Sequence, residues 1–507
     1  MKTLIIEHNR YYDSVFLMRI SAELELLDGV DQAVVAMATL VNVQNIEKSG
    51  FELNSNIEPS DLLIALETAS EQVVETSRRK LDQLLAGAPA EKESTAHRVA
   101  SLDEALNADD EANLALISVP GTYAAREARM ALRRGLHVML FSDNVSIEDE
   151  ISLKKEAVAR GLLMMGPDCG TAILNGSPLG FANVCRHGGI GIVGASGTGI
   201  QEVSSLVHQL GGGISQAIGT GGRDLSDQVD ARMTQFAIAA LGRDPETQVI
   251  VVVSKAPATC VVASILEALR ETRKPGIVQF VGWDPEKADP AWLDTGARFA
   301  ETLQEAASIA VQEIGVELAT APDLPPVQTM RTSRALLGLF CGGTLCQETW
   351  SILDQAGIDV ISNVAFAPEK KASPDMTSSG HAVWDLGDDV FTVGKPHPMI
   401  EPSLRDAKVA ASGQDPSIGL ILVDCVIGYG AHPNPAQSLA DAGRAAYEAA
   451  KAEGREFAVL ASVTGTDEDP QQRTQQRHIL EAAGIIVLPS NADVARTAVH
   501  MLKGEGQ

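Results

Sequence analysis

The sequence predicts an α/β protein built from several doubly wound parallel-sheet domains of Rossmann-like and flavodoxin-like type, preceded by a small N-terminal α/β domain. Of its 507 residues, 45% are hydrophobic but only 4% are aromatic. Such an aliphatic composition is typical of parallel sheets covered by helices. A chain of this length exceeds what one hydrophobic core supports. Short apolar runs also alternate with segments of helical periodicity along the whole chain.

Residues 1–95 are predicted to form the small N-terminal α/β domain. Apolar runs predict strands at 4–6, 33–36 and 61–66, and helical periodicity predicts helices at 12–27 and 70–85. Ser70 has the side chain of a helix N-cap. Residues 86–94 are rich in alanine, glycine and charge, and are expected to be a linker.

Residues 96–185 are predicted to form a second, short domain. Strands are expected at 114–119, 137–141 and 162–165, with helices from 101, at 124–134 and at 147–160. This order is one βαβαβ run, which is half of a nucleotide-binding type of sheet.

Two further α/β domains are expected at 186–322 and 327–507, separated by a proline-rich linker at 322–326. In the last domain, strands are predicted at 335–340, 419–423, 457–462 and 484–488. Between Pro368 and Pro416 the sequence indicates an irregular insert rich in histidine and aspartate. Loops of that length are usually functional or disordered.

The charge and the cysteine pattern narrow the class of protein. A formal net charge of −27 argues against nucleic-acid or anionic-membrane partners, because either would be repelled. The six cysteines show no CxxC spacing, so reduced thiols are expected rather than disulfides. The N-terminus becomes charged too early for a signal peptide, and no apolar run approaches the roughly 20 residues of a membrane span. We expect a soluble cytoplasmic protein.

Two stretches of the chain have the same pattern. Residues 191–202 and 338–348 each pass from an apolar strand through small residues into a helix, and each contains Gly-Thr, two residues and Gln-Glu. A helix N-terminus offers unpaired N–H groups and a positive dipole end to an anion. The pair suggests a duplicated fold that aims two helix ends at one phosphate, although a plain N-capped turn would look similar. The expected phosphate-binding residues are Ser196, Gly197, Thr198, Gly342, Gly343 and Thr344.

These motifs carry a family resemblance. Residues 116–121 and 162–170 resemble the α subunit of succinyl-CoA ligase, and residues 189–199 and 219–224 continue that resemblance. From Gly338 onward the chain is similar to the C-terminal ligase domain of the β subunit. Together with residues 380–389 and 394–402, the chain resembles the FdrA family, which is described as acyl-CoA-synthetase-like.

The resemblance implies a domain division and a site. It makes residues 96–185 a truncated CoA-binding-type domain and makes 186–322 and 327–507 two ligase-like domains. In the ligases, two helix ends hold the phosphate of a phosphohistidine; here these are the helices that open at Ser196 and Gly342. The chain departs from the pattern in three ways. Residues 1–95 have no glycine-rich CoA cradle, residues 282–290 have no histidine, and no ATP-grasp domain is evident.

Because of those departures, both CoA and carbamoyl phosphate remain candidates for the cofactor. The same departures also make companion subunits necessary for a full ligase cycle, in a homo- or hetero-oligomer. The expected small-molecule ligand is an acyl phosphate or an acyl-CoA.

Candidate catalytic residues lie in the insert. His397 stands between two prolines, which fix the backbone, and it follows Lys395, whose charge suits a phosphate or carboxylate. His381 is a second candidate base. Lone histidines are more often structural hydrogen-bond donors than catalytic groups. The acidic residues Asp385, Asp388 and Asp389 are expected to form a solvated loop rather than a metal site.

Candidate substrate-binding residues are Cys169, Gly170, Arg223 and His432. Cys169 takes the place where ligases approach the acyl thioester, but the sequence favours a buried inert thiol. Arg223, followed by Asp224, suits a carboxylate or a surface salt bridge. His432 follows a strand, where ligands bind in open α/β sheets.

Three functions are consistent with these features. The first is an acyl-CoA synthetase-like enzyme subunit that handles an acyl phosphate between two helix N-termini. The second, implied by the FdrA resemblance, is an oxamate carbamoyltransferase subunit, which transfers carbamoyl between oxalurate and phosphate in allantoin and purine catabolism. The third is a non-catalytic scaffold.

Overall fold

The computed structural model divides into two compact units, Met1–Ala100 with Asp389–His397, and Ser101–Asp388 with Pro398–Gln507. It describes residues 1–8, 14–25, 27–38, 42–43, 46–47, 49–51, 57, 61–86, 101–108, 111–283, 292, 295–318, 332–373, 376, 380–392 and 396–503. Apart from Ala86, the two expected linkers lie outside these residues. The described helices include none that is long and apolar enough to cross a membrane.

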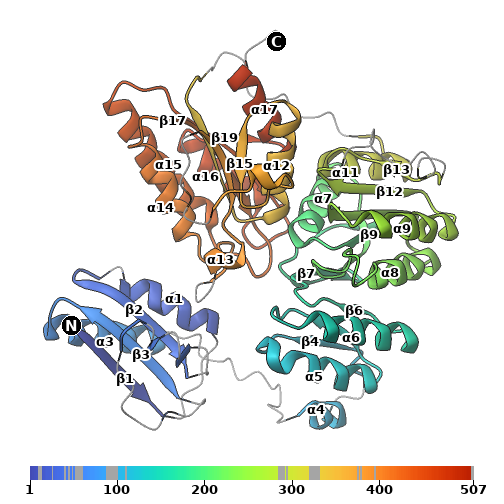
Figure 1. Cartoon of the computed structure of the whole chain (residues 1–507), viewed down its shortest axis with the longest axis horizontal. Coiled ribbons are helices and arrows are strands. Elements are labelled where there is room, and N and C mark those ends of the chain that lie inside the picture. Colours follow the sequence, from blue (N-terminus) through green and yellow to red (C-terminus); the bar gives the residue numbers. More distant parts are fainter. Residues whose placement is uncertain are drawn as a thin grey trace. The chain divides into compact units, whose positions relative to one another are not determined.

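The first unit holds a three-stranded antiparallel sheet with the order β1-β3-β2 (Figure 1). Its elements are β1 (Lys2–Glu7), α1 (Ser14–Glu25), β2 (Val30–Met37), β3 (Leu62–Thr68) and α3 (Glu71–Ala86). Leu17, Ile20 and Leu24 recur at helical spacing on α1 and are buried against this sheet. The predicted strands and helices are therefore present, in an antiparallel arrangement. The short helix α13 (Asp389–Thr392) belongs to the same unit.

The second unit begins with a three-stranded parallel sheet, β4-β5-β6. Its elements are α4 (Leu102–Ala108), β4 (Leu114–Ile117), α5 (Gly121–Arg133), β5 (His137–Leu140), α6 (Ile147–Arg160) and β6 (Met164–Met165). The hydroxyl of Ser146 caps α6 by accepting from the N–H of Asp149, and Gly161 ends it at a left-handed φ of 71°. The predicted βαβαβ run is confirmed.

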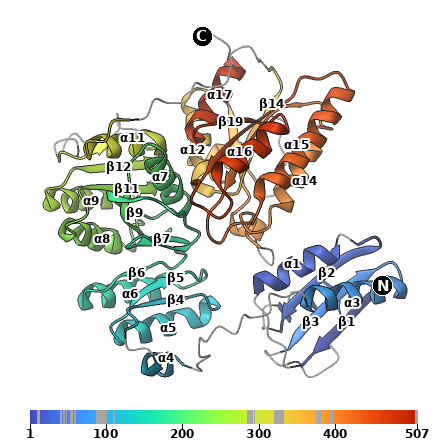
Figure 2. The same cartoon turned by 180° about the vertical axis from the view of Figure 1, so that it is seen from behind.

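A seven-stranded sheet follows, with the order β13-β12-β11-β9-β10-β7-β8. Its strands are β7 (Thr171–Leu174), β8 (Ser177–Gly180), β9 (His187–Gly194), β10 (Ile214–Gly219), β11 (Val249–Lys255), β12 (Gly276–Val281) and β13 (Arg298–Phe299). Its helices are α7 (Gly197–Gln209), α8 (Arg232–Arg243), α9 (Thr259–Thr272) and α11 (Leu303–Glu313). On one face α7 packs against α11, and on the other α8 packs against α9 (Figure 2). The β7–β8 hairpin lies within residues 96–185, yet β7 pairs with β10 of this sheet.

The last sheet has six parallel strands in the order β15-β16-β14-β17-β18-β19. These are β14 (Ala335–Phe340), β15 (Val360–Ser362), β16 (His381–Asp385), β17 (Ile418–Val426), β18 (Ala458–Thr464) and β19 (Ile486–Leu488). The helices are α12 (Gly343–Gln355), α14 (Ser403–Ser412), α15 (Pro435–Ala452), α16 (Arg473–Ala482) and α17 (Asn491–Lys503), with a 3-10 turn at Pro368–Lys370. α12 packs against α17, while α14, α15 and α16 pack in series.

The prediction of an irregular insert between Pro368 and Pro416 is wrong for much of its length. β16 pairs with β14 inside the sheet, and α14 follows it. The sequence contained a signal, because His381–Asp385 is a short apolar run preceded by Gly380. The polar residues on both sides of this run made the strand hard to recognise.

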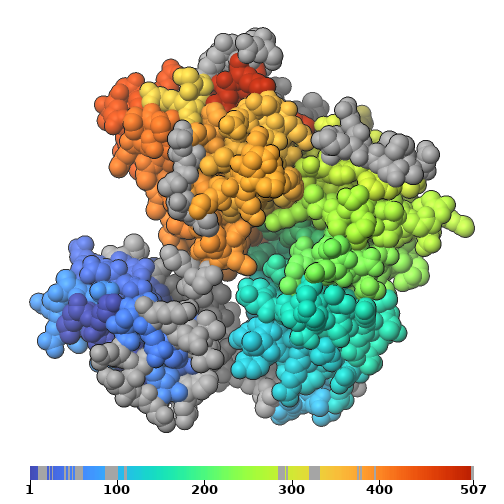
Figure 3. Space-filling model, in the orientation of Figure 1, coloured from blue at the N-terminus to red at the C-terminus, as the bar shows by residue number. Residues whose placement is uncertain are grey.

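The two large sheets share part of their topology. In each, an inner strand (β9 or β14) leads through a Gly-Thr turn into a helix. The next strand, however, pairs with β9 in the seven-stranded sheet, whereas in the six-stranded sheet β16 separates β15 from β14. One cluster of buried residues includes side chains from both sheets and from α7 and α12. The surfaces of the two segments adjoin, green against yellow and orange (Figure 3). The strand–turn–helix unit that the paired motifs predicted is thus present twice.

Candidate functional site

The two Gly-Thr turns meet at their hydroxyl groups. Ser196 is the N-cap of α7, and its Oγ accepts a hydrogen bond from the N–H of Gly199 at 3.0 Å. The same Oγ lies 2.5 Å from Oγ1 of Thr344, in the first turn of α12. Both side chains are buried. The structure therefore brings these predicted residues from two sheets together; anion binding stays a prediction.

Backbone donors surround this contact. In the part of the chain that the structure describes, the N–H groups of Gly197, Thr198, Gly343 and Thr344 make no hydrogen bond. Such groups at the first turn of a helix are the usual donors to phosphate oxygens. The meeting of α7 and α12 therefore concentrates unpaired donors and two positive dipole ends in one place.

Two carboxylates lie at the N-terminus of α12. Asp424, on β17, accepts hydrogen bonds from the N–H groups of Cys341 at 2.8 Å and Gly342 at 2.7 Å. Asp385 ends β16, and a Cβ at Gly343 would clash with its Oδ2, so a side chain there would require the Asp385 carboxylate to move. Burial raises the pKa of Asp385 to about 6 and also raises the pKa of Asp424. An anion at this helix end therefore requires protons or a cation beside it.

Lys255 provides such a cation. It is the last residue of β11 and is exposed, and among the described residues it makes no ion pair. Its positive charge opposes the effect of burial by lowering the pKa of Asp385, and β11, which it ends, packs against α12. Lys255 and Asp424 were missed from the sequence. The available signal was a polar residue at the carboxyl end of a buried strand, where ligands bind in open α/β sheets.

The glutamates of the two Gln-Glu pairs connect the segment of the seven-stranded sheet with the segment of the six-stranded sheet. Glu202, on α7, accepts from the N–H of Asn491, the first residue of α17, at 3.2 Å. Glu348, on α12, accepts from the N–H of Leu303, the first residue of α11, at 2.8 Å, and from Nδ2 of Asn491 at 2.7 Å. Each glutamate thus caps a helix that belongs to the other of these two segments. Burial raises the pKa of Glu348 to about 7 and raises that of Glu202.

Cys169 and Gly170 directly precede β7, whose first residue, Thr171, adjoins Gly197. Burial raises the pKa of the Cys169 thiol to about 12, and its Sγ contacts the carbonyl of Thr171 at 3.6 Å. A Cβ at Gly219 would lie 2.6 Å from this Sγ. The carbonyl of Gly170 accepts from the N–H of Phe181. The inert-thiol interpretation of Cys169 therefore fits, and thiolate chemistry does not.

Arg223 and Asp224 belong to an ionic network rather than to an open binding surface. Nη2 of Arg223 pairs with Oε2 of the buried Glu150 at 2.8 Å. Asp224 is fully buried, pairs with Nζ of Lys154 at 2.8 Å and accepts from the N–H of Thr234 at 2.8 Å. Asp224 thus has a structural role, while Arg223 keeps a partly exposed side chain.

The candidate bases do not gather at this site. His381 is at the amino end of β16, the opposite end from Asp385, and its Nδ1 accepts from the N–H of Leu336 at 3.0 Å. The structure therefore does not bring His381 to this site, and its catalytic role stays a prediction. His397 belongs to the first unit, and burial lowers its pKa to about 4. Lys395 lies outside the described residues. Nδ1 of His432 accepts from the N–H of Asn434 at 3.1 Å within its own turn.

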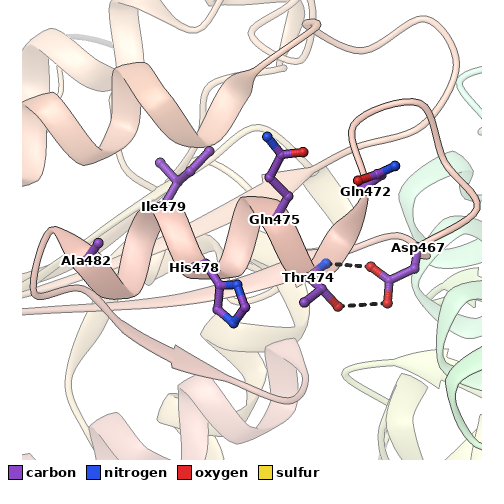
Figure 4. A pocket seen from close by; sticks show the side chains of 7 residues that line it. All are labelled: Asp467, Gln472, Thr474, Gln475, His478, Ile479 and Ala482. Carbon is purple, nitrogen blue, oxygen red and sulfur yellow. Dashed lines mark hydrogen bonds between the residues drawn. The ribbon is translucent and has the colours of Figure 1, made fainter.

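The described residues contain no group of three side chains placed to hold a metal ion, and Asp388 instead lies 3.5 Å from Nδ2 of Asn363. A shallow hollow follows the exposed side of α16 (Figure 4). There Asp467 accepts from both the N–H and the hydroxyl of Thr474, so this helix end is already occupied. The hollow is lined by Asp467, Gln472, Thr474, Gln475, His478, Ile479 and Ala482, and contains none of the predicted site residues.

Three family models match the chain. Residues 339–501 match the model described as CoA-ligase, and residues 186–281 match the CoA binding domain. The match to the CoA binding domain lies on the seven-stranded sheet rather than on residues 96–185. Residues 1–101 match a model described as AllF, heavy metal-associated domain.

The N-terminal residues do not fit a heavy-metal site. Residues 1–101 contain no cysteine, and their histidines are His8 and His97. Nδ1 of His8 is paired with Oδ1 of Asp61 at 3.0 Å. Soft metals are selected by thiolate and thioether ligands. Residues 1–101 offer no thiolate and only the thioethers of Met1, Met18 and Met37, which are far apart in the sequence, so this donor set is a poor one.

Known proteins resemble the chain over different lengths. It is 43% identical to "Uncharacterized protein YahF" of Escherichia coli over 99% of both chains. It is 30% identical to succinate–CoA ligase [ADP-forming] subunit alpha-2 of Trichomonas vaginalis, over 35% of this chain and 55% of that protein. PH0766 of Pyrococcus horikoshii aligns in structure over 78% of this chain and 84% of its own, with a TM-score of 0.35 and 17% identity. The chain therefore belongs to the family of Escherichia coli YahF and, by its CoA-ligase and CoA-binding domains, is an acyl-CoA synthetase-like protein.

Proposed function

We propose that this chain is an enzyme subunit that holds the phosphoryl group of an acyl phosphate between the N-termini of α7 and α12. The observation that carries the proposal is the contact of Ser196 with Thr344 amid the unpaired N–H groups of Gly197, Thr198 and Gly343. A phosphate that enters here exchanges the hydroxyl–hydroxyl bond for bonds to its own oxygens. Gly342 contributes by its small size, because its N–H is already bonded to Asp424.

The same arrangement suits acyl transfer. When a nucleophile attacks the acyl carbon, the bond from carbon to the phosphate oxygen breaks and negative charge grows on the leaving phosphate. Fixed N–H donors and helix dipoles stabilise such charge without reorganising. Lys255 adds a positive charge near this helix end. Asp385, whose pKa is raised to about 6, is suited to exchange the proton that the nucleophile releases.

Carbamoyl phosphate is the alternative ligand. Residues 282–290, in which the ligase resemblance calls for a phosphorylated histidine, contain none. A free acyl phosphate, including carbamoyl phosphate, needs the phosphate site but no phosphohistidine. On this basis a carbamoyl-group transferase, with oxalurate and phosphate as reactants, is the second candidate function.

Companion subunits and the domain division remain part of the proposal. The chain spans about half of the length of the ligase α subunit that it matches, so partner chains are proposed to supply ATP binding, in a homo- or hetero-oligomer in the cytoplasm. The proposed domains are residues 1–95, 96–185, 186–322 and 327–507. Arg223 and His432 stay predicted substrate contacts, and His397 and Lys395 stay predicted catalytic residues.

Isothermal titration of the full chain tests the proposal. Acetyl phosphate, carbamoyl phosphate and acetyl-CoA are titrated separately, each also in the presence of inorganic phosphate. We expect an acyl phosphate to bind and inorganic phosphate to compete with it. Binding of acetyl-CoA alone contradicts the phosphoryl site, and absence of all binding favours the scaffold alternative.

A further inference from the structure

The strand β4 has an open edge. Among the described residues, β5 is the only strand that pairs with it, so β4 is the outer strand of the sheet β4-β5-β6 (Figure 1). The carbonyl of Asn113 accepts from the N–H of His137, and the carbonyl of Ile117 accepts from that of Phe141. Alternate residues of the strand thus direct their backbone groups toward β5, and those of Leu116 point away from the sheet. Such an edge is a template for another strand.

The side chain of Leu116 is exposed on a face of the sheet that is otherwise covered. Its neighbour on β5 is Met139, which is fully buried in a core cluster that includes residues of the seven-stranded sheet. Leu116 lies on the same face, yet 51% of it is exposed. Val119 and Tyr123, which follow along the chain, are exposed by 37% and 63%. Parallel sheets are normally buried on both faces, so the cover of this face ends one strand short.

The two ends of this edge carry opposite charges. Glu111, which precedes β4, and Arg126, in the second turn of α5 directly after β4, are both exposed. Among the described residues Arg126 makes no ion pair, whereas Arg129 and Arg133 on the same helix do. When two copies of the edge meet antiparallel, the acidic end of each faces the basic end of the other. The edge is therefore complementary to itself about a twofold axis.

We propose that β4 pairs antiparallel with β4 of a second copy of this chain, about a twofold axis at Leu116. The N–H of each Leu116 donates to the carbonyl of Leu116 in the other copy, and the two side chains lie side by side on the uncovered face. Arg126 of each copy faces Glu111 of the other. The pairing continues the three-stranded sheet into a six-stranded sheet shared by two chains.

Analytical ultracentrifugation of the full chain, over a wide range of concentration, tests the dimer. Leu116→Asp places two like charges opposite each other at the axis, and Ser118→Pro removes an N–H that points outward from the edge. Val158→Asp is the matched control, because Val158 is an exposed apolar residue on α6 rather than on β4. Circular dichroism verifies that each variant is folded.

We expect the unmodified chain and Val158→Asp to form dimers with the same dissociation constant. Leu116→Asp should raise that constant about tenfold or more, because like charges that face each other are costly. Ser118→Pro should raise it in the same direction, so the test survives if Leu116→Asp does not fold. A chain that stays monomeric, or a dimer that neither variant weakens, overturns the pairing, and another part of this chain or a different protein then covers the edge.

Cross-linking tests the register. In a Cys260→Ser background, which lacks the exposed thiol, Leu116→Cys is compared with Val158→Cys after addition of diamide as the oxidant. Opposed residues of a hydrogen-bonded antiparallel pair have Cα atoms about 5.5 Å apart, which a disulfide spans. We expect Leu116→Cys to form covalent dimers much faster than Val158→Cys, and equal rates contradict an axis at Leu116.

A charge exchange tests the antiparallel arrangement. Arg126→Glu should weaken the dimer, because it places two acidic groups together at each end of the paired strands. The double variant Glu111→Arg/Arg126→Glu should restore the dissociation constant of the unmodified chain, since each end again carries opposite charges. A double variant that associates no more tightly than Arg126→Glu overturns this arrangement.

Discussion

Removal of the hydroxyl of Ser196 should cost more stability than removal of the hydroxyl of Thr344. In Ser196→Ala, α7 loses its N-cap bond to Gly199, worth about 1 kcal/mol. The buried hydroxyl of Thr344 also loses its partner, at a cost of about 1–3 kcal/mol. The sum is about 2–4 kcal/mol. Thr344→Val should cost only about 1 kcal/mol, because Oγ of Ser196 keeps the N–H of Gly199.

The double variant makes this reasoning refutable. Once both hydroxyls are gone, neither is left buried without a partner, so the double variant should cost about 1–2 kcal/mol less than the two single costs together. Urea unfolding followed by tryptophan fluorescence is a suitable assay, because Trp350 lies on α12. Thr259→Val, at the start of α9 and exposed, is the control. Costs that add to within about 0.5 kcal/mol would show that the two hydroxyls do not interact.

Three more predictions follow from buried groups. A thiol reagent should modify the exposed Cys260 in the native protein. It should reach the four buried thiols only on unfolding, because burial raises the pKa of Cys169, Cys341, Cys346 and Cys425. Fast labelling of Cys169 in the native protein would contradict this prediction. Lys154→Met should destabilise the fold by about 3–5 kcal/mol, because it leaves Glu150 and Asp224 buried without their shared cation, and a loss below about 1 kcal/mol would be inconsistent with the network. Burial raises the pKa of Asp385 from 3.8 to about 6 and the pKa of Glu348 from 4.5 to about 7, so both carboxyl groups bind protons more tightly in the folded state than in the unfolded state. The stability that each of the two groups contributes should therefore fall by about 3 kcal/mol as the pH rises from about 4 to 7. Asp385→Asn should therefore gain stability relative to the unmodified chain between pH 5 and pH 8 in urea titrations, and a constant difference would contradict the raised pKa of Asp385.

The fold and the paired turns were predictable because local chemistry determines them. Small residues between an apolar strand and a helix, as around Ser196 and Gly343, require a tight turn in any context. The observed α6 coincides with its predicted range because Ser146 and Gly161 are a strong N-cap and C-cap. β16 was missed because five residues between polar neighbours carry too little periodicity.

The charged part of the site was not predictable, because it depends on which strand ends meet. Asp385, Asp424 and Lys255 come from three strands of two sheets, and only the packing of the sheets brings them near α12. His381 showed the opposite problem. Its histidine identity suggested catalysis, but its place at the amino end of a parallel strand makes it a backbone acceptor. Residue type alone does not say which edge of a sheet a side chain occupies.

The most direct test of the phosphoryl site is the affinity of Thr198→Val/Thr344→Val for acetyl phosphate, measured by calorimetry beside the unmodified chain and the Thr259→Val control. Thr198 and Thr344 stand in the first turns of the two helices that meet. We predict that the double variant folds but loses binding, while Thr259→Val binds as the unmodified chain does. Unchanged affinity in a folded double variant would show that the paired turns are architecture and do not hold a phosphoryl group.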